Sequence, residues 1–126
     1  MFVVNSDKTI FATRGDAGTI IFGSKASSED GFMFETGDII RFKVFKKNQH
    51  DAVVIQKDVV IDAATTKTTI ELTSSDTKIG DIINKPVDYW YEIEAYPDTD
   101  STLTLIGYDA DGPKIFRLFP EGGDLR

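Results

Sequence analysis

The 126-residue sequence contains no cysteine, which excludes disulfide bonds, thiolate nucleophiles and cysteine-ligated zinc sites. It has one histidine, His50, although histidine is the usual general base near neutral pH. Long apolar runs are also missing, since the run from Phe2 to Val4 is far too short for a signal-peptide core or a membrane span. We therefore expect a chain made in the cytoplasm with no membrane partner.

Basic residues are the minority, with 14 against 21 acidic residues and a formal net charge of -7. Because that average field repels a polyanion, we expect no nucleic-acid partner. The local exception is RFKVFKK, in which Arg41, Lys43, Phe45 and Lys47 share one face if the segment is extended. This pattern is typical of a solvated strand face, and the alternative is a stripe that binds an anionic ligand.

Motifs for catalysis and for cofactors are lacking as well. His50 beside Asp51 could form the base and orienting half of a triad, but no G-x-S-x-G nucleophile motif accompanies them. Asp109 and Asp111 in GYDADGPK resemble the start of a calcium loop, yet the third ligand and the distal glutamate are missing. We predict no enzyme, no cofactor, no metal site and no catalytic residue, and a tight turn at GYDADGPK.

What the sequence does contain is apolar alternation at period two, which predicts β-strands. Eight strands are expected, at 9–13, 18–23, 38–47, 52–62, 67–73, 86–96, 102–108 and 113–122. In the fourth of these the apolar phase breaks at Lys57 and Asp58, which indicates either a bulge or an edge position. Pro86 heads its strand, where its missing N–H does least harm.

Turn residues separate the expected strands, at Gly15-Asp16, Asp30-Gly31, Gly37-Asp38, Pro97-Asp98 and Asp111-Gly112. One helical turn is predicted after Thr73, because Thr73 and Asp76 have the capping-box spacing and Gly80 offers a stop. Seven to eight short strands with at most one short helical turn predict an all-β fold, an antiparallel β-sandwich of the immunoglobulin-like kind or a jelly roll. We expect a single domain over 1–120 and a loose tail over 121–126.

Most of the aromatic side chains lie in phase with the expected strands and are assigned to the core. Trp90 is different, because it is out of phase with Tyr89 and Tyr91 and stands among Asp88 and Glu92. This phase makes Trp90 either an exposed contact residue or part of an interface between subunits.

The tripeptide Arg14-Gly15-Asp16, a motif that integrins bind in some secreted proteins, lies between two expected strands and is followed by Ala17-Gly18. A reversal or a bulged strand start is the natural interpretation of this composition. We expect a turn here rather than an integrin-binding loop.

Five stretches taken together, TRGDAGTIIF, FETGDIIRFKVF, IELTSSDTKIG, KPVDYWYEIE and IGYDADGPKIFRLFPEGGD, resemble small proteins encoded in prophages of Gram-positive gut bacteria. Their order is similar to that of the N-terminal domain of phage baseplate upper proteins. The resemblance implies an immunoglobulin-like, non-enzymatic virion structural or assembly module of the baseplate, tail or head fibre. It would be made in the bacterial host cytoplasm, reside in the virion, form a homo-oligomer and contact other phage structural proteins.

Six side chains are our candidates for protein contacts: Trp90, Arg41, Lys43, Lys47, Phe116 and Phe119. The alternative function is a carbohydrate or cell-surface binding module, in which the aromatic side chains and the acidic turns would form the site.

Overall fold

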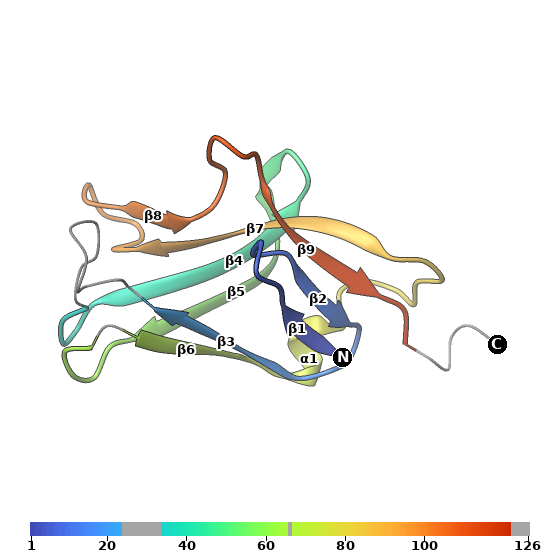
Figure 1. Ribbon diagram of the computed structural model, residues 1–126, viewed down its shortest axis with the longest axis horizontal. Helices are drawn as coiled ribbons and strands as arrows, with labels where there is room; N and C mark the ends of the chain where they lie inside the picture. Colours follow the sequence, from blue (N-terminus) through green and yellow to red (C-terminus); the bar gives the residue numbers. More distant parts are fainter. Residues whose placement is uncertain (24–33, 66, 122–126) are drawn as a thin grey trace.

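The computed structural model describes residues 1–23, 34–65 and 67–121, which form nine strands and one short helix (Figure 1). In chain order these are β1 (Phe2–Val4), β2 (Ile10–Thr13), β3 (Gly18–Gly23), β4 (Ile39–Lys46), β5 (Gln49–Val60), β6 (Lys67–Leu72), α1 (Ser74–Thr77), β7 (Val87–Ala95), β8 (Leu103–Ile106) and β9 (Lys114–Phe119). Eight of the strands lie where alternation predicts them. The ninth, β1, is only three residues long, too short for a periodic signal.

The strands form two sheets. The large sheet has seven strands in the order β1-β2-β9-β7-β4-β5, with β8 also paired to β7, and the small sheet consists of β3 and β6. The neighbours β9, β7 and β4 correspond to strands G, F and C of an immunoglobulin-like sandwich, and β3 with β6 corresponds to the B–E pair of the opposite sheet. Figure 1 shows β3 and β6 side by side, and these two strands pair with each other rather than with the large sheet.

The prediction of an all-β, sandwich-like fold with one short helical turn is confirmed. One pairing departs from a purely antiparallel sandwich, because β2 runs parallel to β9 with Ile10 opposite Phe116. A parallel pair needs a long crossover connection, and here almost the whole chain lies between the two strands. The expected turn at Asp30-Gly31 and the expected loose tail, except for Glu121, lie outside the described residues.

The core lies between the sheets and consists of the inward half of each alternating strand. The largest fully buried apolar side chains are Phe34, Phe42, Phe116, Ile10, Ile40, Ile70, Ile93, Leu118 and Val44. Each such side chain contributes roughly 1.5–3 kcal/mol of transfer free energy on burial. The sandwich is therefore held together chiefly by apolar burial.

Gly18 allows the two sheets to approach closely at the first strand. A Cβ atom on Gly18 would lie 2.0 Å from Cγ of Phe2, so the Phe2 ring occupies the space that any other residue would fill. The same ring packs edge-on against Phe116, with centroids 6.5 Å apart. Phe2 of the short strand β1 thus joins the core although β1 is at the sheet edge.

The helical turn α1 begins as the sequence predicts. The Thr73 hydroxyl accepts the backbone N–H of Asp76, and the Asp76 carboxylate accepts the backbone N–H of Thr73, which completes the capping box. Lys57 of β5 also pairs with the Asp76 carboxylate at 2.9 Å. Although burial raises the pKa of Asp76, the hydrogen bonds from Lys57 and Thr73 outweigh it and lower that pKa overall.

Strand β5 is an edge strand, the second of the two predicted alternatives. Its pairing with β4 is regular at Lys57 and Asp58, and the register shifts lie instead between Val44 and Phe45 and between Phe45 and Lys46. Of the two alternatives for Lys57 and Asp58, the edge position is the one observed. Lys57 breaks the apolar phase because it points inward at the edge to reach Asp76, and an inward charge protects an edge strand from pairing with other chains.

No helix among the described residues is long and apolar enough to cross a membrane.

Candidate functional site

The side of the large sheet that faces away from the core, called here the outer face, carries the polar half of each alternating strand. On β7 the inward residues Tyr91 and Ile93 are buried, whereas Trp90 and Glu92 between them lie on the outer face and are partly exposed. The predicted phase of Trp90 is therefore correct. Cross-strand registers place Trp90 opposite Phe45 of β4.

Cross-strand ion pairs cover much of the outer face. Arg117 of β9 donates two hydrogen bonds to Asp88 of β7, from Nε at 2.6 Å and from Nη2 at 3.1 Å. The hydrogen bond lowers the pKa of the Asp88 carboxyl and raises the pKa of the Arg117 guanidinium. On β4, Lys43 lies 3.5 Å from Glu92 of the neighbouring strand. Opposite charges on facing strands thus neutralise one another within the sheet.

Arg41 is the most completely paired of the basic residues on the outer face. Its guanidinium donates to both carboxylate oxygens of Asp58, at 2.8 and 3.0 Å, and to Asp98 at 3.0 Å. The hydrogen bond with Asp58 raises the pKa of Arg41 above its ordinary value and lowers the pKa of Asp58. Such a bidentate pair, extended by a third carboxylate, holds the β7–β8 turn against β4 and β5.

The structure does not support the alternative interpretation of RFKVFKK as a stripe that binds an anionic ligand. Arg41 and Lys43 share the outer face as expected, but both are already bound to carboxylates, and the Phe45 side chain is 6 % exposed. Lys47 lies beyond the end of β4 in the exposed β4–β5 turn. These residues do not present a row of free positive charges to an anionic ligand.

His50 is part of this face rather than a residue of a free loop. It is the second residue of β5, its ring packs edge-on against Phe45 with centroids 4.9 Å apart, and its Nε2 is 2.7 Å from Oε1 of Glu92. The side chain of His50 is 57 % exposed. The partner of the His50 ring is Glu92 of β7 rather than its chain neighbour Asp51, and only the folded sheet brings the two side chains close.

Beside Trp90 the outer face is hollowed into a pocket of about 200 Å³. Its lining residues are Phe45, Asn48, His50, Trp90, Glu92 and Tyr108. Tyr108 comes from the loop between β8 and β9, is 70 % exposed and packs against Trp90 with ring centroids 5.7 Å apart. Sequence reasoning missed both Tyr108 and Asn48. The expected strand 102–108 includes Tyr108, but β8 ends at Ile106, and only the β8–β9 loop and the β4–β5 turn bring these two residues to Trp90.

The two candidate contact residues on β9 have different environments. Phe116 has no exposed surface and packs against Phe42 in the core, so its assignment as a surface contact is wrong. Phe119 is partly exposed on the outer face and packs edge-on against Phe11 with centroids 5.2 Å apart. The alternation along β9 points Phe116 inward and places Phe119 on the opposite side.

The Arg14-Gly15-Asp16 turn is a structural element. The Arg14 side chain is 10 % exposed and donates to the backbone oxygens of Ile79 and Gly80 and to the Glu121 carboxylate. Gly15 has a φ of 88°, a left-handed conformation that favours glycine. An arginine held in this way cannot extend into a receptor, so the expectation of a turn is confirmed.

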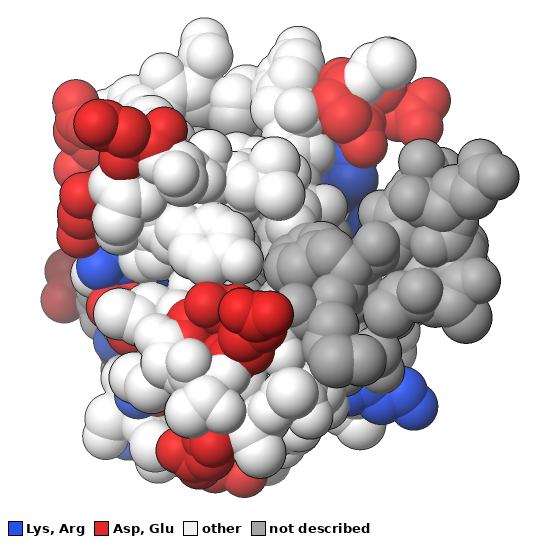
Figure 2. All heavy atoms as spheres, turned by 90° about the vertical axis from the view of Figure 1, so that its left-hand side faces the viewer, with Lys and Arg blue, Asp and Glu red and all other residues white. Residues whose placement is uncertain are grey.

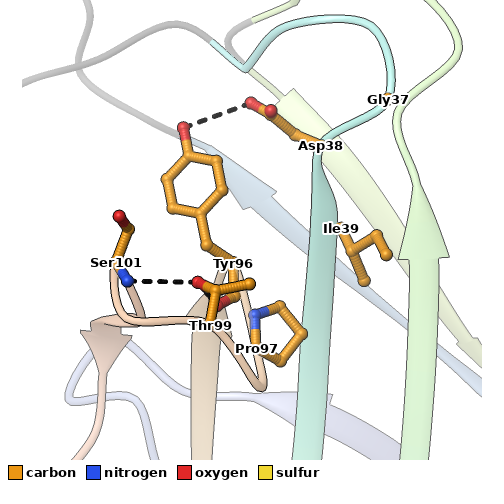
Figure 3. A pocket seen from close by; sticks show the side chains of 7 residues that line it. All are labelled: Gly37, Asp38, Ile39, Tyr96, Pro97, Thr99 and Ser101. Atoms are coloured by element: carbon orange, nitrogen blue, oxygen red, sulfur yellow. Dashed lines mark hydrogen bonds between the residues drawn. The ribbon is translucent and has the colours of Figure 1, made fainter.

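A second hollow lies at the end of the molecule where β7 turns into β8, next to the start of β4. Figure 2 shows acidic side chains gathered over this end, and Figure 3 shows Tyr96 pointing toward Asp38 across the opening. The hollow measures about 360 Å³, and the Tyr96 hydroxyl donates to Asp38 at 3.4 Å. Burial, aided by the Asp38 charge, raises the pKa of Tyr96.

The acidic turns do not assemble into a metal centre within the described part of the chain, where no three acidic or histidine side chains are placed to hold an ion. Asp109 accepts the backbone N–H of Asp111 at 2.9 Å and pairs with Lys114, and its backbone bridges to Gly112. The hydrogen bond with Lys114 lowers the pKa of Asp109. These contacts are those of a tight turn, as predicted for GYDADGPK.

The chain matches no protein-family model, and no curated protein or solved structure is significantly similar to it. The interpretation of the outer face therefore depends on its own geometry.

Proposed function

We propose that this chain is a non-enzymatic structural module that works through protein–protein contacts made by the outer face of its large sheet. The observation that carries the proposal is the combination of paired charges and a partly exposed tryptophan on that face. Trp90 lies between the Arg117–Asp88 pair and the Lys43–Glu92 pair on neighbouring strands. Tryptophan, tyrosine and arginine are the residue types enriched at the centres of protein interfaces.

Paired charges favour such a role for an energetic reason. Covering an isolated charge with a partner protein costs several kcal/mol of desolvation, whereas a charge that keeps its own counter-ion loses less. Arg41, Lys43 and Arg117 each keep a carboxylate partner inside the same sheet. A partner could therefore cover this face and bury Trp90 without supplying matching charges of its own.

The resemblance of the sequence to the N-terminal domain of phage baseplate upper proteins supports a more specific proposal. The module is a virion component of the baseplate, tail or head fibre, and its partners are further copies of itself and neighbouring structural proteins. The immunoglobulin-like strand order described above agrees with what that resemblance implies for the fold.

Lysine acetylation of intact particles tests the contact surface. Lys47 borders the outer face and Lys67 lies on the small sheet, and both are exposed in the isolated chain. In particles that contain the protein, we expect Lys47 to react at less than about one tenth of its rate in the isolated chain. Its neighbour Asn48 lines the pocket beside Trp90, so a partner that covers Trp90 also shields this turn from solvent. Lys67 is the matched control and keeps its rate. Equal reactivity of Lys47 in the particle and in the isolated chain would contradict the proposed surface.

A further inference from the structure

The pocket beside Trp90 has the composition of a small-ligand site, and nothing in the proposed structural role requires it. Its floor and walls are aromatic, formed by Phe45 on β4, Trp90 on β7 and Tyr108 on the β8–β9 loop. The rings of Trp90 and Tyr108 are inclined by 58°, so they form an open wedge rather than a closed stack. Small-molecule sites typically combine such apolar walls with a few placed polar groups.

Some polar atoms at the pocket have hydrogen-bond partners within the protein, and others have none among the described residues. Glu92 is only 13 % exposed, and its Oε1 lies 2.7 Å from His50 Nε2 and 3.5 Å from Lys43 Nζ. The described residues offer Oε2 no hydrogen-bond partner, and they offer no acceptor to the indole N–H of Trp90. A poorly exposed carboxylate oxygen without a partner is costly. Glu92 and Trp90 are two residues apart on the same face of β7, about 7 Å along the strand.

The size and charge of the pocket restrict its ligand. A volume of about 200 Å³ is below the 300–1,000 Å³ of sites for drug-sized molecules, so it suits a single ring. The Glu92 charge is balanced by Lys43, which disfavours an added cation, and the net charge of -7 disfavours an anion. A neutral ligand is therefore favoured, with one apolar face for the aromatic wedge and hydroxyls for the unpaired donor and acceptor.

We propose that this pocket binds one neutral pyranose ring of a saccharide. The axial C–H face of the ring packs on Trp90 and Tyr108, whose π-faces are electron-rich. A hydroxyl donates to Glu92 Oε2, another accepts from the Trp90 indole, and the Asn48 side chain at the rim can do either. The site lies inside the proposed contact surface, so a partner that covers Trp90 would exclude the sugar.

Fluorescence titration of the isolated full chain tests the proposal, because Trp90 is its only tryptophan and reports directly on the pocket. The probes are glucose, galactose, mannose, N-acetylglucosamine and rhamnose, each up to about 100 mM, well above the millimolar Kd expected for a single ring. Tetramethylammonium chloride and glucuronate at the same concentration serve as the cationic and anionic comparisons. We expect saturable binding of at least one neutral sugar and of neither ion.

Variants then locate the binding. Tyr108→Ala removes a wall of the pocket without touching the core, and we expect at least a tenfold rise in Kd. Kd is measured also from amide chemical shifts, because loss of the tyrosine could itself change the fluorescence of Trp90. Ile21→Ala is the matched control, since Ile21 is 72 % exposed on the small sheet, and it leaves Kd unchanged. Failure of all five sugars to bind, binding of an ion instead, or an unchanged Kd in Tyr108→Ala would each overturn the proposal. None of these results bears on whether the chain is a virion component.

Discussion

Arg14 and Glu121 are 107 residues apart in the chain, yet the Arg14 Nη1 donates to Oε1 of Glu121 at 2.9 Å. The same guanidinium holds the backbone of Ile79 and Gly80 after α1, while Asp16 pairs with the amino group of Met1. One turn between β2 and β3 thus secures the first residue, the segment that leads into β7 and the segment that follows β9.

Arg14→Ala should lower the free energy of unfolding strongly, although Arg14 lies in a turn and not in a strand of the core. The change leaves two backbone oxygens without their donor in a site where the arginine side chain is 10 % exposed, so we expect a loss of about 2–4 kcal/mol in the free energy of unfolding, measured with urea. Glu121→Gln should cost less than about 1 kcal/mol, because Glu121 is 36 % exposed and its pair with Arg14 is partly screened. Similar costs for the two variants would show that the backbone bonds of Arg14 contribute little.

Thr77→Val tests the opposite side of the same turn. Thr77 has no exposed surface, and its hydroxyl accepts the backbone N–H of Gly15 and donates to the backbone oxygen of Asp16, both at 2.9 Å. Valine keeps the shape and removes both bonds, together with the weaker bond of the hydroxyl to the backbone oxygen of Ser74 at 3.2 Å, so we expect a loss of about 2–3 kcal/mol in thermal or urea unfolding. Thr68→Val is the matched control, since Thr68 is 9 % exposed and the described residues give its hydroxyl no partner. A comparable loss in Thr68→Val would refute the hydrogen-bond explanation.

Phe116→Ala and Phe119→Ala should differ strongly although the two residues lie in one strand. Phe116 is completely buried between Phe42 and Phe2, so its truncation should cost about 3–5 kcal/mol. Phe119 is partly exposed beside Phe11, and its truncation should cost less than about half of that. The midpoints of urea unfolding measure the two losses, and we expect the lower midpoint for Phe116→Ala. Equal midpoints would contradict the inward placement of Phe116.

Acid should weaken the sandwich partly through Asp88. Its folded pKa is depressed by the hydrogen bond from Arg117, so this contribution to stability is present above the unfolded pKa of about 4 and is lost as the pH falls through the folded pKa. The unfolding free energy of Asp88→Asn should therefore fall less steeply below about pH 4 than that of the wild type. Asp81→Asn, an equal charge change at an exposed loop position, is the matched control for the lost charge. An identical slope for Asp88→Asn would show that the Arg117 pair adds no pH dependence.

Eight of the nine strands, the capping box after Thr73 and the outward phase of Trp90 could be predicted, because each depends on period-two alternation or on residues within four positions. The parallel pairing of β2 with β9 could not, since nothing in local sequence records which distant strand lies alongside. The expectation of a surface contact is wrong for Phe116 because alternation along β9 sends this side chain into the core.

The candidate site was harder to predict than the fold. The charges of Arg41 and Lys43 are visible in sequence, but their partners Asp58 and Glu92 come from other strands. The pocket beside Trp90 needs Tyr108, which a turn brings back over the sheet.

Mass spectrometry of purified phage particles from the strain that encodes this chain tests the central claim most directly. The proposed structural role predicts peptides of the chain in intact particles, in stoichiometric ratio to the other structural proteins. Intact particles that carry no such peptides would contradict it.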